Sequence, residues 1–114
     1  MDNHTIAREI AQTLSDRKAQ EIVIIDIAEK SSFADYFVNC TAGSERLLGA
    51  LQEFVEEKAA SLGLTARSIE GRAGTGWLLI DYGDIIVNVF TRETRERYAL
   101  DKIWGDCEFE YIEE

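Results

Sequence analysis

The sequence contains no proline, a single histidine (His4) and two cysteines, Cys40 and Cys107. With one histidine, the chain lacks the usual parts of a histidine-based metal site and of a Ser-His-Asp catalytic triad. The cysteines are far apart and form no C-x-x-C pattern, and Cys40 is expected to be a small apolar residue of a strand. We therefore expect no catalytic residue, no metal site and no cofactor.

Long apolar runs and basic residues are also scarce. No run approaches the about 18 apolar residues of a membrane span, so we expect no membrane contact. Twelve Lys plus Arg stand against 22 acids, which gives a formal net charge of -10. Because phosphate binding depends on neutralisation by Lys and Arg, this balance disfavours direct nucleic-acid recognition and favours a basic protein partner. The first residues match neither a signal peptide nor a transit peptide, which predicts a cytoplasmic protein.

The composition is that of one ordinary globular domain. A chain of 114 residues with 46% hydrophobic and 30% charged residues has the size and balance of a single folded unit. It has no repeat and no low-complexity linker. We expect one domain over residues 1–114, with a short acidic tail at about 106–114.

Hydrophobic periodicity predicts an α/β fold, more closely an α+β mixed sheet of about five strands flanked by helices. Helices are predicted over 3–16 and from Ser44 to about 62. Strands are predicted at 22–27, 36–41 and 65–70, and a hairpin at 77–82 and 85–90. A helix between 36–41 and 65–70 implies that these two strands are parallel. A closing helix is predicted over 92–104, followed by a solvated terminus.

Two short motifs suggest an enzyme as the alternative function. Gly43 and Ser44 lie between a strand and a helix, where nucleotidyltransferases hold a triphosphate. Such enzymes also need paired carboxylates for divalent metal, and the predicted strand at 65–70 has none. Asp81 and Asp84 flank the hairpin turn, although Asp at a turn commonly binds its own backbone. The alternative is thus a residual metal-dependent nucleotidyltransferase or nucleotide-binding protein that uses these four residues.

Large aromatic residues gather beside acids in the last third of the chain. Aromatic anchors with a charged rim are typical of protein interfaces. Along a strand at 77–82, Trp77 and Asp81 share one face, which favours partial exposure of that face. Packing of the same rings in the core is the alternative interpretation.

Four blocks of the sequence stand out: DYFV at 35–38, GSER at 43–46, EG at 70–71 followed by GWLLIDYGDIIVNVF at 76–90, and RYALDKIW at 97–104. On these blocks the chain, from about Ile6 to Trp104, resembles the Iojap-like ribosomal silencing factors, called RsfS in bacteria. The family usually has histidine where this chain has Asn88, which disfavours an acid or base role for that position.

The resemblance implies a nucleotidyltransferase-like fold without catalytic acids, and a protein that is not an enzyme. It implies binding to the large ribosomal subunit through a ribosomal protein, L fourteen, on the subunit-joining face, which blocks subunit joining when nutrients are short. A homodimer is a further expectation, and a dimeric adaptor with another client is a third hypothesis. Clustering and the matched blocks together give the candidate partner-binding residues: Trp77, Asp81, Tyr82, Asp84, Tyr98, Asp101 and Trp104.

Overall fold

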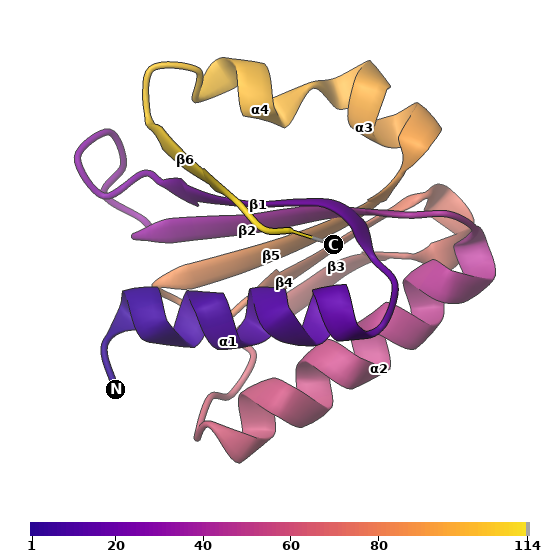
Figure 1. Cartoon of the computed structure of the whole chain (residues 1–114), viewed down its shortest axis with the longest axis horizontal. Helices are drawn as coiled ribbons and strands as arrows, with labels where there is room; N and C mark the ends of the chain where they lie inside the picture. The colour runs from indigo at the N-terminus through magenta and orange to yellow at the C-terminus, as the bar shows by residue number, and fades with distance from the viewer. Residues whose placement is uncertain (114) are drawn as a thin grey trace.

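A six-stranded sheet in the order β3-β4-β5-β2-β1-β6 forms the central layer of the protein. The structure is a computed structural model that describes residues 1–113. Two long helices cover one face of the sheet and two short helices cover the other (Figure 1). The elements are α1 (Asn3–Asp16), β1 (Gln20–Asp26), β2 (Tyr36–Ala42), α2 (Glu45–Ser61), β3 (Ser68–Arg72), the 3-10 turn η1 (Ala73–Thr75), β4 (Trp77–Asp81), β5 (Ile85–Thr91), α3 (Arg92–Tyr98), α4 (Leu100–Ile103) and β6 (Glu108–Tyr111).

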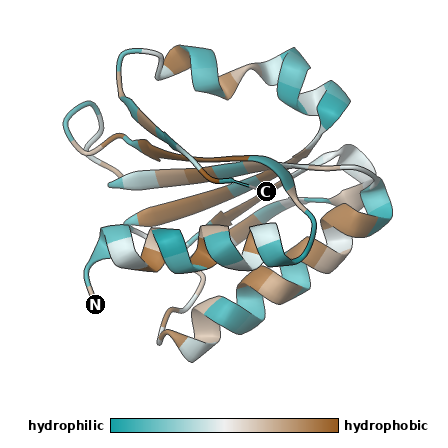
Figure 2. Ribbon diagram, viewed as in Figure 1, coloured by the Kyte–Doolittle hydropathy of each residue, from teal (hydrophilic) through white to brown (hydrophobic). Residues whose placement is uncertain are grey.

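The main hydrophobic core lies between the sheet and the helices α1 and α2. Both helices are amphipathic, and Figure 2 shows apolar and polar segments alternating along each of them. Asp2 caps α1 by accepting from the Thr5 N–H at 2.8 Å, and Ser44 caps α2 by accepting from the Leu47 N–H at 3.1 Å. Within residues 1–113, no helix is both long and apolar enough to cross a membrane. The core includes Ile10, Leu14, Ile24, Val38, Leu51, Val55, Leu78 and Val87.

The opposite face of the sheet carries a smaller core beside a polar centre. Strand residues alternate between the two faces, so neighbours of the main-core residues point toward α3 and α4. Asn39 and Asn88, on adjacent strands, are 0% exposed. The apolar part of this second core comprises Val23, Ile25, Ile27, Ala34, Phe37 and Ile86, and Trp104 and Phe109 are among the residues packed against it.

The structure confirms both long helices, the β4–β5 hairpin, a mixed sheet and the common direction of β2 and β3, although these two strands are not neighbours. β3 pairs antiparallel with β4 at the sheet edge, whereas the parallel neighbour of β2 is β5. β3 does run in the same direction as β2, with β4 and β5 between them. Burial explains the order: β5 is buried over nearly its whole length and takes a central place, while every residue of β3 is exposed.

The closing segment consists of two short helices instead of one. Ala99 has a left-handed φ of 47° and separates α3 from α4. Chain direction changes there because an L-residue in this region cannot continue a right-handed helix.

The predicted acidic tail contains a sixth strand. Residues 108–111 pair antiparallel with β1 as β6, so the sheet has one strand more than expected. Phe109 packs against the second core. On the other side of β6, Glu110 accepts from His4 at 2.8 Å and forms an ion pair with Arg8, which ties the strand to α1. Glu114, the last residue of the predicted tail, lies outside the described residues.

Candidate partner-binding site

The indole of Trp77 is the centre of an aromatic group on the second face of the sheet. Its ring centroid lies 5.3 Å from that of Phe90, with 26° between the planes, and 4.8 Å from that of Tyr98. Trp77 and Phe90 are cross-strand partners in the β4–β5 pair, which places their rings side by side. Because α3 follows β5 directly, it brings Tyr98 over the indole. Tyr98 is 46% exposed and Trp77 is half-buried.

A cavity of about 250 Å³ opens beside these rings, lined by Glu70, Gly71, Thr75, Trp77, Leu79 and Tyr98. Pockets for small molecules usually measure about 300–1,000 Å³, so this cavity is small for a metabolite. Its size and aromatic walls suit the insertion of a single anchor side chain from a protein partner.

A continuous chain of hydrogen bonds leads from the indole to α4. The Trp77 Nε1–H donates to Asn88 Oδ1 at 3.1 Å, and Asn88 Nδ2 donates to Asn39 Oδ1 at 3.0 Å. Asn39 Nδ2 in turn donates to Asp101 Oδ1 at 2.9 Å. The other carboxylate oxygen of Asp101 accepts from Arg95 Nη2 at 2.8 Å. Asn88 bonds the indole directly and Asn39, Asp101 and Arg95 follow it in the chain of hydrogen bonds; we call these four residues the polar relay.

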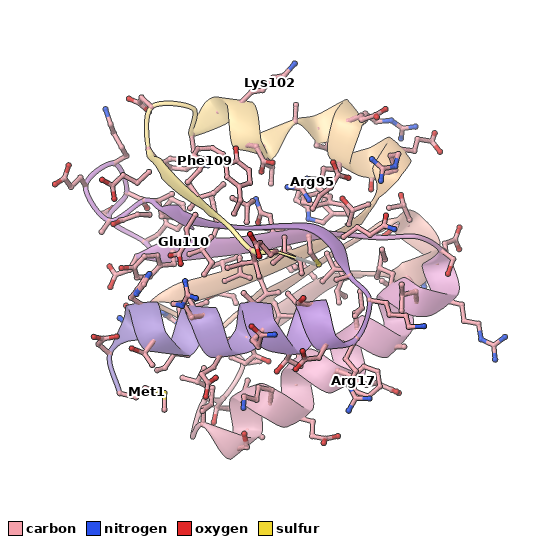
Figure 3. The ribbon with its side chains drawn as sticks, in the orientation of Figure 1. Met1, Arg17, Arg95, Lys102, Phe109 and Glu110 are labelled. Carbon is pink, nitrogen blue, oxygen red and sulfur yellow. The ribbon has the colours of Figure 1, made fainter. Side chains whose placement is uncertain are left out.

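The two ends of the polar relay fix its direction. An indole N–H can only donate and an ionised carboxylate can only accept, so each amide between them must turn its oxygen toward Trp77 and its nitrogen toward Asp101. Arg95 also binds the sheet, because its Nη1 donates to the Glu21 carbonyl at 2.6 Å and to Thr41 Oγ1 at 3.0 Å. Figure 3 shows Arg95 between α3 and the sheet. The polar relay therefore ties both short helices to the centre of the sheet.

The structure brings three of the candidate residues together: Trp77 and Tyr98 by ring contact, and Asp101 through the polar relay. Trp104 lies in a different group, where its ring centroid is 5.6 Å from that of Phe37 and 6.2 Å from that of Phe33. It packs against the second core.

The other three candidate residues lie at the β4–β5 turn. Asp81 accepts from the Gly83 N–H at 2.7 Å, which is the local role expected of Asp at a turn. Asp84 is exposed. Tyr82 packs against the main core, on the α2 side of the sheet; burial raises the pKa of its hydroxyl to about 12, and that buried oxygen has no hydrogen-bond partner among the described residues.

The residues of the alternative enzyme site do not come together. Ser44 follows the C-terminal end of β2, whereas Asp84 directly precedes β5. These strands are parallel and in register from Tyr36↔Ile85 to Ala42↔Thr91, so the seven-residue length of β2 separates Ser44 from both acids. At about 3.3 Å per residue that is on the order of 20 Å. No group of three His, Cys, Asp or Glu side chains in the described part of the chain is placed to hold a metal ion.

Negative charge is concentrated away from the aromatic cavity. Residues 65–102 contain equal numbers of acids and bases, while the charged residues of 103–114 are all acids. A second cavity, of about 360 Å³, lies between α1, β1, β2 and β6, and its walls include Asp26, Glu108 and Glu110. Burial, and then the neighbouring Asp26 and Asp35, raise the pKa of Tyr36 there. The net charge of -10 thus gives the molecule an acidic end around β6.

The sequence interpretation missed Asn39, Asn88 and Arg95. One signal was present: asparagine is depleted in strands, yet each of two β-branched runs carries one near its middle. Arg95 stood in a segment of alternating charge that predicts a solvated helix face, but its side chain is only 15% exposed.

Known proteins resemble this chain over nearly its whole length. A family model described as "Ribosomal silencing factor during starvation" matches residues 1–114. The "Ribosomal silencing factor RsfS" of Bacillus subtilis is 32% identical over 107 residues, which cover 94% of this chain and 91% of that protein. The protein of the same name from Zymomonas mobilis is 36% identical, and the matched region covers 91% of this chain and 78% of that protein. A crystal structure of a Chromobacterium violaceum protein, 28% identical, superposes with a TM-score of 0.88 over 92% of this chain and 88% of the other.

Proposed function

Since this chain belongs to the RsfS family of ribosomal silencing factors, we propose that it acts in the cytoplasm by binding the large ribosomal subunit and preventing the small subunit from joining. The contact we propose is with a ribosomal protein on the subunit-joining face, L fourteen, and the outcome is reduced translation when nutrients are limiting. The mechanism is steric. Subunit joining brings two extended surfaces together, and a folded domain attached to one of them keeps them apart without any chemical step.

The aromatic cavity carries this proposal. Trp77 and Tyr98 supply large, rigid rings at a partly exposed site, and such rings provide most of the binding energy in many protein interfaces. The Trp77 side chain is already held in place by Phe90 and Asn88. A preorganised anchor loses less conformational entropy on binding, which favours affinity.

Charge supports a protein contact in preference to an RNA contact. A chain of net charge -10 is repelled by ribosomal phosphates, so it binds best where basic protein is at the surface. The aromatic cavity lies in the electrically balanced part of the chain, which permits close approach there. In the bound orientation that we propose, the acidic end around β6 points away from RNA or toward basic protein.

Sedimentation through a sucrose gradient tests the proposal. The purified protein is mixed with separated ribosomal subunits, and the opposite subunit is then added under joining conditions. We expect cosedimentation with the large subunit alone and fewer joined particles. Failure to bind either subunit would contradict the proposal.

Two variants test the site. Trp77→Ala and Tyr98→Ala should each weaken large-subunit binding by about 2 kcal/mol, or about thirtyfold in Kd. Tyr111→Ala is the matched control, because Tyr111 is 73% exposed on β6 and lies outside the aromatic cavity. Unchanged affinity in folded Trp77→Ala and Tyr98→Ala proteins would move the contact elsewhere, with Asp81, Asp84 and Trp104 tested next. Loss of self-association without loss of ribosome binding would assign the rings to a homodimer contact.

A further inference from the structure

Two fully buried asparagines at the centre of a sheet need an explanation. Asn39 and Asn88 face each other across the parallel β2–β5 pair and are both 0% exposed. Buried polar groups destabilise a fold unless they are hydrogen-bonded, and apolar β-branched residues suit this position better. The two amides do pair with each other, but each also has a second partner outside the two strands: the Trp77 indole on one side and the Asp101 carboxylate on the other.

We propose that the polar relay is a positioning device that sets the Trp77 indole, and with it the aromatic cavity, for partner binding; this inference rests on the proposed function. Asn88 acts directly on the indole, and Asn39, Asp101 and Arg95 act through Asn88. No residue of the relay lines the cavity itself, so the relay acts on the cavity through the position of Trp77.

The hydrogen-bond polarity allows one arrangement only. Since the relay begins at an obligatory donor and ends at an obligatory acceptor, neither amide can flip without placing two donors or two acceptors face to face. The Asn88 oxygen is therefore always turned toward Trp77, and the indole N–H is satisfied only when the ring directs it at that oxygen. The relay thus selects one indole orientation, in which the ring stacks on Phe90.

The relay also couples the two walls of the cavity. Tyr98 belongs to α3, as does Arg95, whose guanidinium joins Asp101 in α4 to the Glu21 carbonyl and Thr41 of the sheet. Ala99, with its left-handed backbone, lies between the two helices. One connected set of bonds therefore fixes the Trp77 wall through Asn88 and the Tyr98 wall through Arg95.

Single substitutions can break the relay at different links. In Asp101→Asn one carboxylate oxygen becomes an NH₂ group, which faces a donor, either Asn39 Nδ2 or Arg95 Nη2, whichever way the amide turns. Asn88→Leu removes both the acceptor for Trp77 and the donor for Asn39. Asn88→His should preserve the indole orientation and large-subunit binding, because a neutral imidazole also offers one acceptor and one donor. Asp16→Asn is the matched control, since Asp16 lies at the end of α1 across the sheet and Gln12, on the same helix, donates to it at 3.0 Å.

The readout is the indole N–H of Trp77 in the free protein, measured by NMR and assigned by its loss in Trp77→Phe. In Asp101→Asn and Asn88→Leu we expect the signal to shift and its hydrogen exchange to accelerate at least tenfold, with large-subunit binding at least tenfold weaker. Asn88→His and Asp16→Asn should resemble the unmodified protein in both measurements. Asp101→Asn serves as the folded test if Asn88→Leu does not fold, because Asp101 is only half-buried.

Two results would overturn the inference. An unchanged indole signal in folded relay variants would show that the relay does not position Trp77, whatever happens to ribosome binding. A perturbed indole with unchanged binding, in an experiment where Trp77→Ala does lose binding, would show that the partner does not need the selected orientation. Failure of the proposed binding site gives a third, distinguishable result: Trp77→Ala itself would then bind the large subunit as tightly as the unmodified protein does.

Discussion

Replacing Gly71 by alanine perturbs the wall of the aromatic cavity at a point where the backbone leaves no room. Gly71 has a φ of +79°, and a Cβ atom at this position would lie 2.2 Å from the Trp77 carbonyl oxygen. Both the backbone conformation and the close approach therefore require glycine.

The expected loss of stability follows from these two effects. A left-handed backbone costs an L-residue about 1–2 kcal/mol. The clash is with backbone, in a strand pair that includes Gly71↔Leu78 and Arg72↔Trp77, so relief of the overlap must distort the ladder at a cost of about 1–2 kcal/mol for one or two hydrogen bonds. We expect Gly71→Ala to lower the free energy of unfolding by about 2–4 kcal/mol. With a urea m-value of about 2 kcal/mol/M, the midpoint falls by about 1–2 M.

Gly74 provides a matched control three residues away. It has no positive φ, and a Cβ atom there meets nothing within 4 Å, so Gly74→Ala should change the unfolding free energy by less than about 0.5 kcal/mol. Both variants are compared with the unmodified protein by urea unfolding at one pH and temperature. Equal midpoints for Gly71→Ala and Gly74→Ala would refute the reasoning.

Three further outcomes are expected. Tyr82→Phe should leave the unfolding free energy unchanged or raise it by up to about 1 kcal/mol, because the lost hydroxyl is buried and has no partner within residues 1–113; a clear loss in urea unfolding would contradict this. Burial raises the pKa of Cys40 to about 12, so a disulfide reagent at pH about 8 should modify at most one thiol of the native protein, Cys107, and none after Cys107→Ser. The hydrogen bond from Thr5 lowers the pKa of Asp2 below 3.8, so the charged cap stabilises above that pH and its contribution is lost as the pH falls through the lowered value. Asp2→Asn keeps a capping side chain that does not titrate, so the urea unfolding midpoint should depend less on pH in the acid range.

Local patterns predicted the elements that depend on local causes. The apolar stripe and caps of α1 and α2 and the turn of the β4–β5 hairpin follow from residues a few positions apart, and all three are present. Sheet order depends instead on which strands have the most apolar surface to bury, and a crossover helix gives only the direction of the strand after it. β3 therefore has its predicted direction, while its place at the edge of the sheet was not predicted.

The tail shows how charge can obscure a strand. The segment 108–111 alternates polar and aromatic side chains, which is a strand pattern: Glu108, Phe109, Glu110 and Tyr111. Their acidity suggested a solvated terminus, because nothing local indicates that Arg8 and His4 of α1 stand opposite Glu110. Long-range pairing of this kind has no signature within a short window of sequence.

Prediction of the site was limited in the same way. Residue type identified Trp77, Tyr98 and Asp101 as candidates, but not that a network joins two of them. The sequence pattern predicts Asp101 in a charged rim, whereas its carboxylate binds Asn39 and Arg95. Asparagine in place of the family's usual histidine at position 88 argues against acid–base chemistry there. Its structural role depends instead on the one donor and one acceptor of its amide.

The relay is better explained by binding than by stability. A buried polar network that is replaced as a whole by well-packed apolar residues often leaves a protein equally or more stable, whereas removal of one member leaves an unpaired group. Isoleucine at positions 39 and 88 would extend the apolar runs of β2 and β5, and the fold has an ample core on the α1 and α2 side without them. The same change would leave the Trp77 N–H without its acceptor and Asp101 without Asn39. What the two amides add is therefore orientation of the indole and attachment of α3 and α4, and both are properties of the surface that we propose for partner binding.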